Sequence, residues 1–337
     1  MNVHELPMIA FTVLAQMSVG AFVVLGIINV IARLRGASTE VLDEISDPAA
    51  YAIGGTLILG LGASMFHMND PLNVLNVFRH FDSSWLSREI IGGMAFSGIG
   101  FVYAACQFFK IGSAGMRQIL AGITAIVGII FVWAMANVYY SLPTVPAWNT
   151  WITPARFYTT SLLLGAFAIG AAFMAVVMLR RRAALKSTSA KTAEGAAASR
   201  RLGRLGGVVR KQIGQERYSP EARAIILASL RGIAIAGVAL LGFEFVLQSL
   251  HLTDLMQHGA VGIESAHAFS GTLSVLRIVL VSVGAGVMAL FLFRTASNPE
   301  APALGVATLV TVAFACVLVA EFLGRAAFYE QMTRIGM

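Results

Sequence analysis

Long apolar runs separated by short polar or charged clusters dominate the sequence. A helix needs about 20 mostly apolar residues to cross a bilayer, because hydrocarbon offers no partner for backbone N–H and C=O groups. The runs that approach this length lie at residues 8–32, 50–67, 89–109, 118–140, 157–180, 223–250, 267–293 and 303–324. The pattern predicts an all-α integral membrane protein, a bundle of eight transmembrane helices.

A stretch of different composition separates two groups of runs. Residues 183–220 are rich in Ala, Ser, Gly, Lys and Arg and have too few apolar side chains to pack a core, which predicts a basic cytoplasmic linker. Helices one to five then occupy residues 1–182, and helices six to eight occupy residues 221–337. The first run is longer than the apolar core of a signal peptide, and no Lys or Arg precedes it, so we expect a retained first helix.

The distribution of Lys and Arg predicts the orientation, because cytoplasmic loops retain these residues. Basic residues follow the odd-numbered helices, at Arg33, Arg35, Lys110, Arg117, Arg294 and throughout the linker. Loops after even-numbered helices hold only Arg79, Arg88 and Arg156. We therefore expect the N- and C-termini on the periplasmic side of a bacterial inner membrane.

Composition supports the membrane assignment and narrows the partners. The chain is 57% hydrophobic and only 12% charged, whereas soluble domains have about a quarter of their residues charged. The net charge of +7 comes largely from the linker, which favours contact with anionic membrane lipids and argues against a nucleic-acid partner.

Ionisable side chains inside the predicted spans are candidates for function, because placing them in hydrocarbon is costly. The polar side chains within spans are Gln16, Asn29, Gln107, Asn137, Arg231, Glu244, Arg277 and Glu321. Glu321 and Arg325 have the i, i+4 spacing of an ion pair on one helix face, which predicts a structural pair. Glu244 and Arg277 lie on neighbouring helices and would neutralise each other if they meet.

The segment 64–91 concentrates polar residues between two apolar helices on the predicted outer side. His67 ends the second helix and Glu89 begins the third, so both side chains are expected near one depth. Oxidising a quinol requires groups that accept protons near neutral pH, and an imidazole beside a partly desolvated carboxyl meets that need. A polar loop that simply caps two helices explains the same residues equally well.

Haem and metal sites are not expected. A b-type haem takes two axial histidines from facing helices, but the six histidines all lie near the predicted outer boundary. The two cysteines lack a CxxC spacing, and no nucleotide-binding, HExxH or serine-nucleophile motif is present. Any redox role therefore requires a partner that carries the redox centres.

Several runs resemble the membrane-anchor subunit of the dimethyl sulfoxide reductase family of molybdoenzymes. They are His4-Glu5-Leu6-Pro7, the segment from His67 through Pro71 to Leu86-Ser87-Arg88-Glu89, Arg156-Phe157-Tyr158-Thr159, and Gly324-Arg325 with Phe328-Tyr329. The resemblance covers most of the apolar chain and leaves out the linker.

The resemblance implies an eight-helix anchor without haem that oxidises menaquinol. It also implies two partners: an iron–sulfur electron-transfer subunit, and a catalytic subunit that holds molybdopterin. Positions matching His67 and Glu89 bind the quinol in such anchors. Arg79 and Arg88 then either orient the iron–sulfur subunit or stabilise the carboxylate at the quinol site.

Two other functions remain open at this point. A polysulfide-reductase-type quinone subunit has the same helix count and also lacks haem. A secondary transporter would show an internal repeat with broken helices in corresponding halves, and we find no convincing repeat in the sequence.

Overall fold

The computed structural model describes residues 6–65, 78–189, 218–298 and 302–335. The predicted site residue His67 lies outside these ranges. Within them the chain is helical and contains no strand, as the apolar pattern predicts. The long helices are α1 (Leu6–Leu34), α2 (Thr39–Met65), α3 (Trp85–Phe109), α4 (Ala114–Tyr140), α5 (Ile152–Ser189), α8 (Pro220–Met256) and α12 (Ala303–Glu330).

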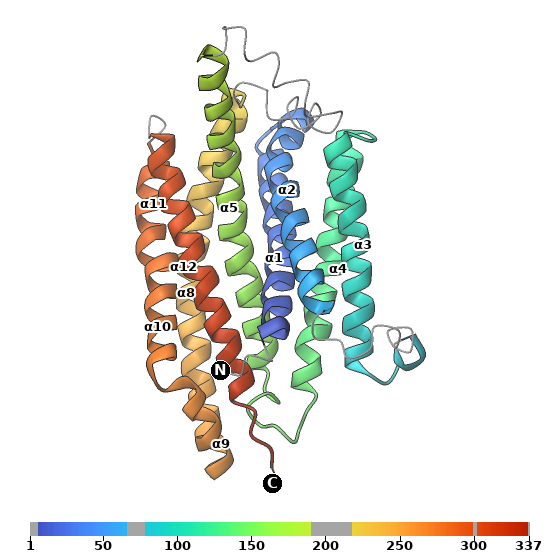
Figure 1. Cartoon of the computed structure of the whole chain (residues 1–337), viewed down its shortest axis with the longest axis vertical. Helices are drawn as coiled ribbons and strands as arrows, with labels where there is room; N and C mark the ends of the chain where they lie inside the picture. Colours follow the sequence, from blue (N-terminus) through green and yellow to red (C-terminus); the bar gives the residue numbers. More distant parts are fainter. Residues whose placement is uncertain (1–5, 66–77, 190–217, 299–301, 336–337) are drawn as a thin grey trace.

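A further apolar rod is assembled from three consecutive elements. These are α10 (Thr272–Val281), the π-helical η5 (Ser282–Met288) and α11 (Ala289–Ala296). The short helix α9 (Gly259–Ala266) and the 3-10 turn η4 (His267–Phe269) lead into the rod. The helices run side by side along the long axis of the molecule (Figure 1).

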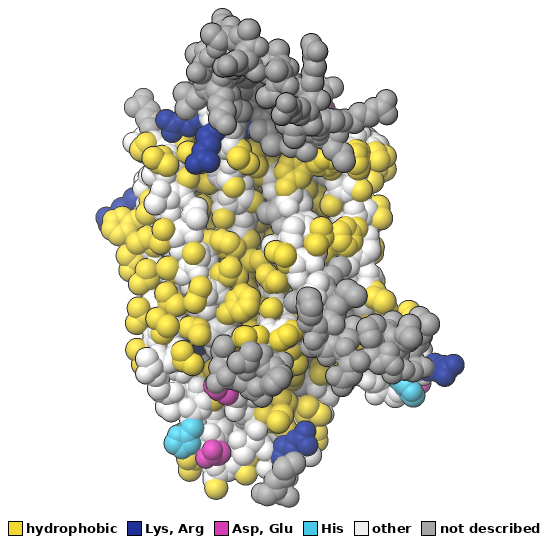
Figure 2. Space-filling model, viewed as in Figure 1, with side chains coloured by type: hydrophobic (Ala, Val, Ile, Leu, Met, Phe, Trp, Pro, Cys, Tyr) yellow, Lys and Arg dark blue, Asp and Glu magenta, His cyan; other side chains and the backbone are white. Residues whose placement is uncertain are grey.

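Among the described residues, seven helical segments are long and apolar enough to cross a membrane. They are α1, α3, α4, α5, α8, the α10–α11 rod and α12. The eighth expected span, 50–67, falls on α2, which is not among the seven. Helix α2 begins at Thr39, earlier than predicted, and its first turns carry four acidic residues, so its apolar part is confined to its second half. On the face shown in Figure 2, hydrophobic side chains cover the middle of the molecule and charged ones lie toward its ends.

Serine side chains fix where several helices begin. Ser84, Ser113 and Ser219 precede α3, α4 and α8, and each hydroxyl accepts a hydrogen bond from a backbone N–H three residues later. Such caps satisfy N–H groups that have no partner within the helix. The starts of these three helices are therefore encoded locally.

Helix α5 lies between the two groups of helices, in contact with α1 on one side and with α8 and α12 on the other. The contact with α1 is backbone to backbone, because a Cβ added at Gly20 would lie 1.7 Å from the Ser161 carbonyl oxygen. Gly165 meets Gly20 in the same way. Small residues allow such close packing in membranes, where van der Waals contact replaces the hydrophobic effect between helices.

The beginning of α1 and the end of α12 lie at the same end of the bundle. The Thr12 hydroxyl and the Tyr329 phenol are 3.0 Å apart, which joins the first and last helices. The opposite end is tied together by Glu44 of α2, which accepts hydrogen bonds from Arg180 at 3.4 Å and from the Ser219 hydroxyl at 3.1 Å. This arrangement agrees with the expectation that both termini face one side.

Candidate functional site

Glu89 lies in the second turn of α3, at the end of the bundle where α1 begins and α12 ends. Only 8% of the residue is exposed. Burying a carboxyl group in apolar surroundings disfavours its charged form, so a carboxyl in this position is suited to accept a proton. The sequence therefore singled out a carboxyl group that is indeed buried, while its relation to His67 stays a prediction.

Arg88 holds the chain that leads into α3. Its guanidinium donates hydrogen bonds to the carbonyl oxygens of Phe81 at 2.9 Å and Asp82 at 2.7 Å, and it lies 4.3 Å from the centre of the Trp85 ring. These contacts fix the start of α3 and so the position of Glu89 on the next residue. Arg79, in contrast, is exposed.

The face of α3 one turn below Glu89 is open because it carries glycine. A Cβ added at Gly93 would lie 3.2 Å from the Phe131 ring of α4. A cavity of about 20 Å³ lies there, lined among others by Phe11 of α1, Gly60 of α2, and Gly93 and Ser97 of α3. Four helices thus meet around the space beneath the buried carboxyl group.

Two tyrosines that the sequence did not single out lie within electrostatic range of Glu89. The hydroxyl groups of Tyr139 and Tyr329 are 3.1 Å apart. Their rings belong to an aromatic cluster with Trp148 and Phe328, in which the Trp148 indole N–H donates to the Phe328 carbonyl oxygen at 2.8 Å. The signal for these residues was the Phe-Tyr pair near the end of the chain.

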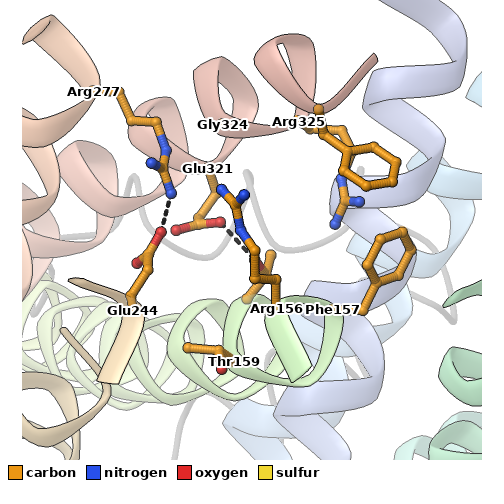
Figure 3. Close-up of a pocket in the computed structure, with 10 residues that line it drawn as sticks. Arg156, Phe157, Thr159, Glu244, Arg277, Glu321, Gly324 and Arg325 are labelled. Carbon is orange, nitrogen blue, oxygen red and sulfur yellow. Dashed lines mark hydrogen bonds and ion pairs between the residues drawn. The ribbon is translucent and has the colours of Figure 1, made fainter. Parts of the chain in front are cut away.

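A cluster of buried charges lies deeper, where α5, α8, α10 and α12 meet (Figure 3). The predicted pairing of Glu244 with Arg277 is confirmed, because Arg277 donates to the Glu244 carboxylate across the bundle. Arg156 at the start of α5 points toward the Glu321 carboxylate (Figure 3). The sequence placed Arg156 among loop residues and missed its part in this cluster.

The predicted ion pair between Glu321 and Arg325 is wrong. Glu321 instead accepts a hydrogen bond from Thr160 of α5 at 2.7 Å, and Arg325 donates to the Gln16 side chain of α1 at 2.7 Å. The Arg325 guanidinium also lies 3.9 Å from the centre of the Phe157 ring. A ring face and a buried amide oxygen together outweigh the neighbouring carboxylate on the same helix.

The buried charges surround a second cavity of about 20 Å³. Four buried polar atoms there have no hydrogen-bond partner in the described structure: one nitrogen each of Arg156 and Arg277, and one oxygen each of Glu244 and Glu321. A polar cavity of this size holds about one water molecule, which needs two to four polar partners. Gly324 leaves the necessary room, since a Cβ there would lie 2.5 Å from the Arg277 Nε.

A third polar cluster lies at the opposite end of the bundle. Asp43 of α2 accepts from Lys110 at 2.9 Å and from Arg117 at 2.8 Å, and Asp47 accepts from Lys110 at 2.6 Å. Burial alone would raise the pKa of Asp43, but the hydrogen bonds from Lys110 and Arg117 outweigh it and lower that pKa. For Asp47, which is more deeply buried, burial prevails and raises the pKa. These contacts neutralise the acidic start of α2.

In the part of the chain that the structure describes, no three His, Cys, Asp or Glu side chains gather closely enough to hold a metal ion. His251 of α8 is engaged with Gln331, at 2.9 Å from its side-chain oxygen, and its ring packs edge-on against Phe269.

Comparison with known proteins gives a consistent result. Residues 1–330 match the family described as DMSO reductase anchor subunit (DmsC). The sequence is 32% identical over 164 residues to a chain of the anaerobic dimethyl sulfoxide reductase of Escherichia coli K12, which is 48% of this protein and 55% of that one. It is 27% identical over 335 residues to YnfH, another anaerobic dimethyl sulfoxide reductase chain of the same organism, and the match spans 99% of this protein and 97% of YnfH.

A more distant similarity, 28% identity over 145 residues, links the protein to a sulfite dehydrogenase subunit of Allochromatium vinosum and spans 38% of this protein and 43% of that subunit. The alignment with the first E. coli relative spans about half the length of that relative, whereas the alignment with YnfH extends along nearly the whole of both proteins.

Proposed function

The chain belongs to the DMSO reductase anchor subunit (DmsC) family, and from this premise we propose that it oxidises menaquinol and passes the electrons to an iron–sulfur subunit. That subunit would supply a molybdopterin-containing subunit, where the terminal acceptor is reduced. The relatives named as dimethyl sulfoxide reductase chains support this assignment. The buried carboxyl group of Glu89 is the observation that supports it most directly.

The chemistry requires two proton acceptors. Oxidation of a quinol to a quinone releases two protons and two electrons, and the hydroxyl groups lose their protons most readily to a base held within hydrogen-bonding distance. Glu89 supplies one such base at the end of α3, and His67 would supply the other. The electrons would leave to a cluster in the docked subunit, since this chain is not proposed to store them.

The two arginines have different parts in this proposal. Arg88 is a positioning residue, because its hydrogen bonds to the carbonyl oxygens of Phe81 and Asp82 fix the loop before Glu89. Arg79 is exposed at the same end and is free of burial, which suits contact with an acidic surface of the iron–sulfur subunit.

The sidedness of the proposal follows from the charge distribution. The end of the bundle that holds Glu89 would face the periplasm of a bacterial inner membrane, with both termini on that side and α2 as the eighth span. Protons and electrons would then leave the quinol on one face of the membrane.

The proposal is tested in the assembled complex with the substitution Glu89→Gln. This change keeps the size and most of the polarity of the side chain but removes its ability to accept a proton. We expect the quinol-dependent turnover number to fall by about 100-fold or more, as for loss of a general base. Activity with a reduced dye that donates directly to the partner subunits is expected to stay unchanged.

Glu264→Gln is the matched control, because Glu264 is an exposed carboxylate on α9 at the same end of the bundle. Its quinol-dependent rate is expected to equal that of the wild type. Full quinol-dependent activity in the Glu89→Gln complex, with normal assembly, would remove Glu89 from the proposed site.

A further inference from the structure

A large groove lies on the side of the molecule where α1 and α8 flank α5. Its volume is about 590 Å³, some thirty times that of either internal cavity. Apolar side chains such as Val24 and Ile28 of α1 form one wall, and Ala166 of α5 contributes to the floor. The other wall, on α8, is shallow because it presents Ala228 and Gly232.

The groove contains one charge that the quinol proposal does not use. Arg231 lies in the α8 wall, half-buried, among the apolar residues Ile225 and Ile233. In the described structure, no hydrogen bond or ion pair joins its guanidinium to another side chain. An arginine that faces lipid inside a span is costly unless an anion or water compensates it.

The other charges on the groove leave it positive. Arg35, which follows α1, and Glu221, in the first turn of α8, are exposed and also line it. Arg35 and Arg231 together outweigh Glu221 by one charge. From Arg35 to Val24 the α1 wall extends about 16 Å, because a helix rises about 1.5 Å per residue. The hydrocarbon of one leaflet is about 15 Å thick, so the groove matches the depth of one leaflet.

We infer that this groove binds an anionic glycerophospholipid, with the phosphate paired to Arg231 and Arg35 and an acyl chain lying along Val24, Ile28 and Gly232. Guanidinium groups bind phosphate oxygens through charge-assisted hydrogen bonds. Apolar contact with the acyl chain adds affinity in proportion to the surface covered. The site is separate from Glu89 and does not depend on the quinol proposal.

The experiment uses the assembled complex in nanodiscs made of equal parts phosphatidylglycerol and phosphatidylcholine with identical acyl chains. Lipids that remain bound after transfer to detergent are then counted by native mass spectrometry. We expect the wild type to retain phosphatidylglycerol in preference to phosphatidylcholine. Arg231→Gln is expected to lower that retention by about tenfold, the usual effect of losing a charge-assisted hydrogen bond.

Two further variants separate charge from shape. Gly232→Leu adds a side chain where a Cβ meets no atom within 4 Å, so it should fold normally and displace the acyl chain. Arg294→Gln removes an exposed charge at the end of α11, outside the groove, and should retain lipid as the wild type does. Equal retention of the two lipids by the wild type, unchanged retention in Arg231→Gln, or replacement of the lipid by a quinone in the same site would overturn the inference.

Discussion

Arg325 of α12 donates a hydrogen bond to the Gln16 side-chain oxygen of α1 at 2.7 Å, although a carboxylate lies one helical turn away on its own helix. This contact joins the last long helix to the first, close to the aromatic cluster around Tyr139. It shows that partners across the bundle, and not neighbours on one helix, determine where the buried charges point.

The contact gives the first prediction. Replacing Gln16 by Leu removes the acceptor and leaves the Arg325 guanidinium buried with one hydrogen bond fewer. The free energy of unfolding should fall by about 1.5–3 kcal/mol, as for other hydrogen bonds to charged groups. It is measured by denaturant unfolding in detergent micelles. Gln118→Leu on α4 is the control, and an equal loss in the two variants would show that the Gln16 contact has no special weight.

The buried pair of Glu244 and Arg277 gives the second prediction. Glu244→Leu leaves the arginine uncompensated and should destabilise the protein by about 3–5 kcal/mol, whereas the double substitution with Arg277→Leu should cost much less. Unfolding of the two single variants and the double variant supplies a double-mutant cycle. Additive losses would mean that the two side chains do not act as a pair.

Asp43 gives the third prediction, which concerns pH. Its pKa is lowered in the folded protein because Lys110 and Arg117 donate to it, although burial opposes them. The stability it contributes is therefore present above the unfolded pKa of about 4 and is lost as the pH falls through the folded value. Asp43→Asn should reduce the midpoint of thermal unfolding at pH 7, and the difference from the wild type should shrink below about pH 4.

The control for this series is Glu264→Gln, since Glu264 is exposed and its replacement should leave the pH profile unchanged. A deficit of Asp43→Asn that persists undiminished into acid would show that the packing of Asp43, and not its charge, is what matters.

How much of this could be read from the sequence differs between elements. The long helices could, because each apolar run is the local requirement of a span and serine caps mark several starts. The start of α2 could not, because Glu40, Asp43 and Asp47 look like loop residues until α3 and α4 supply Lys110 and Arg117. The tertiary contact therefore permits a helix that the local sequence does not announce.

The candidate site shows the same division. Glu89 stood out as a carboxyl group at the start of an apolar helix, and its burial follows that position. Arg156 and Thr160 did not stand out, because their role depends on how α5 is rotated against α8 and α12. The i, i+4 rule failed for Glu321 because it describes isolated helices, and here the faces of both side chains are covered by other helices.

The most direct test of the account is an electron cryo-microscopy map of the assembled complex with a menaquinol-analogue inhibitor bound. The account predicts density for the analogue's ring within hydrogen-bonding distance of the Glu89 carboxyl group, at the end of α3. Inhibitor density elsewhere in the bundle, with the surroundings of Glu89 unoccupied while quinol oxidation is fully blocked, would contradict it.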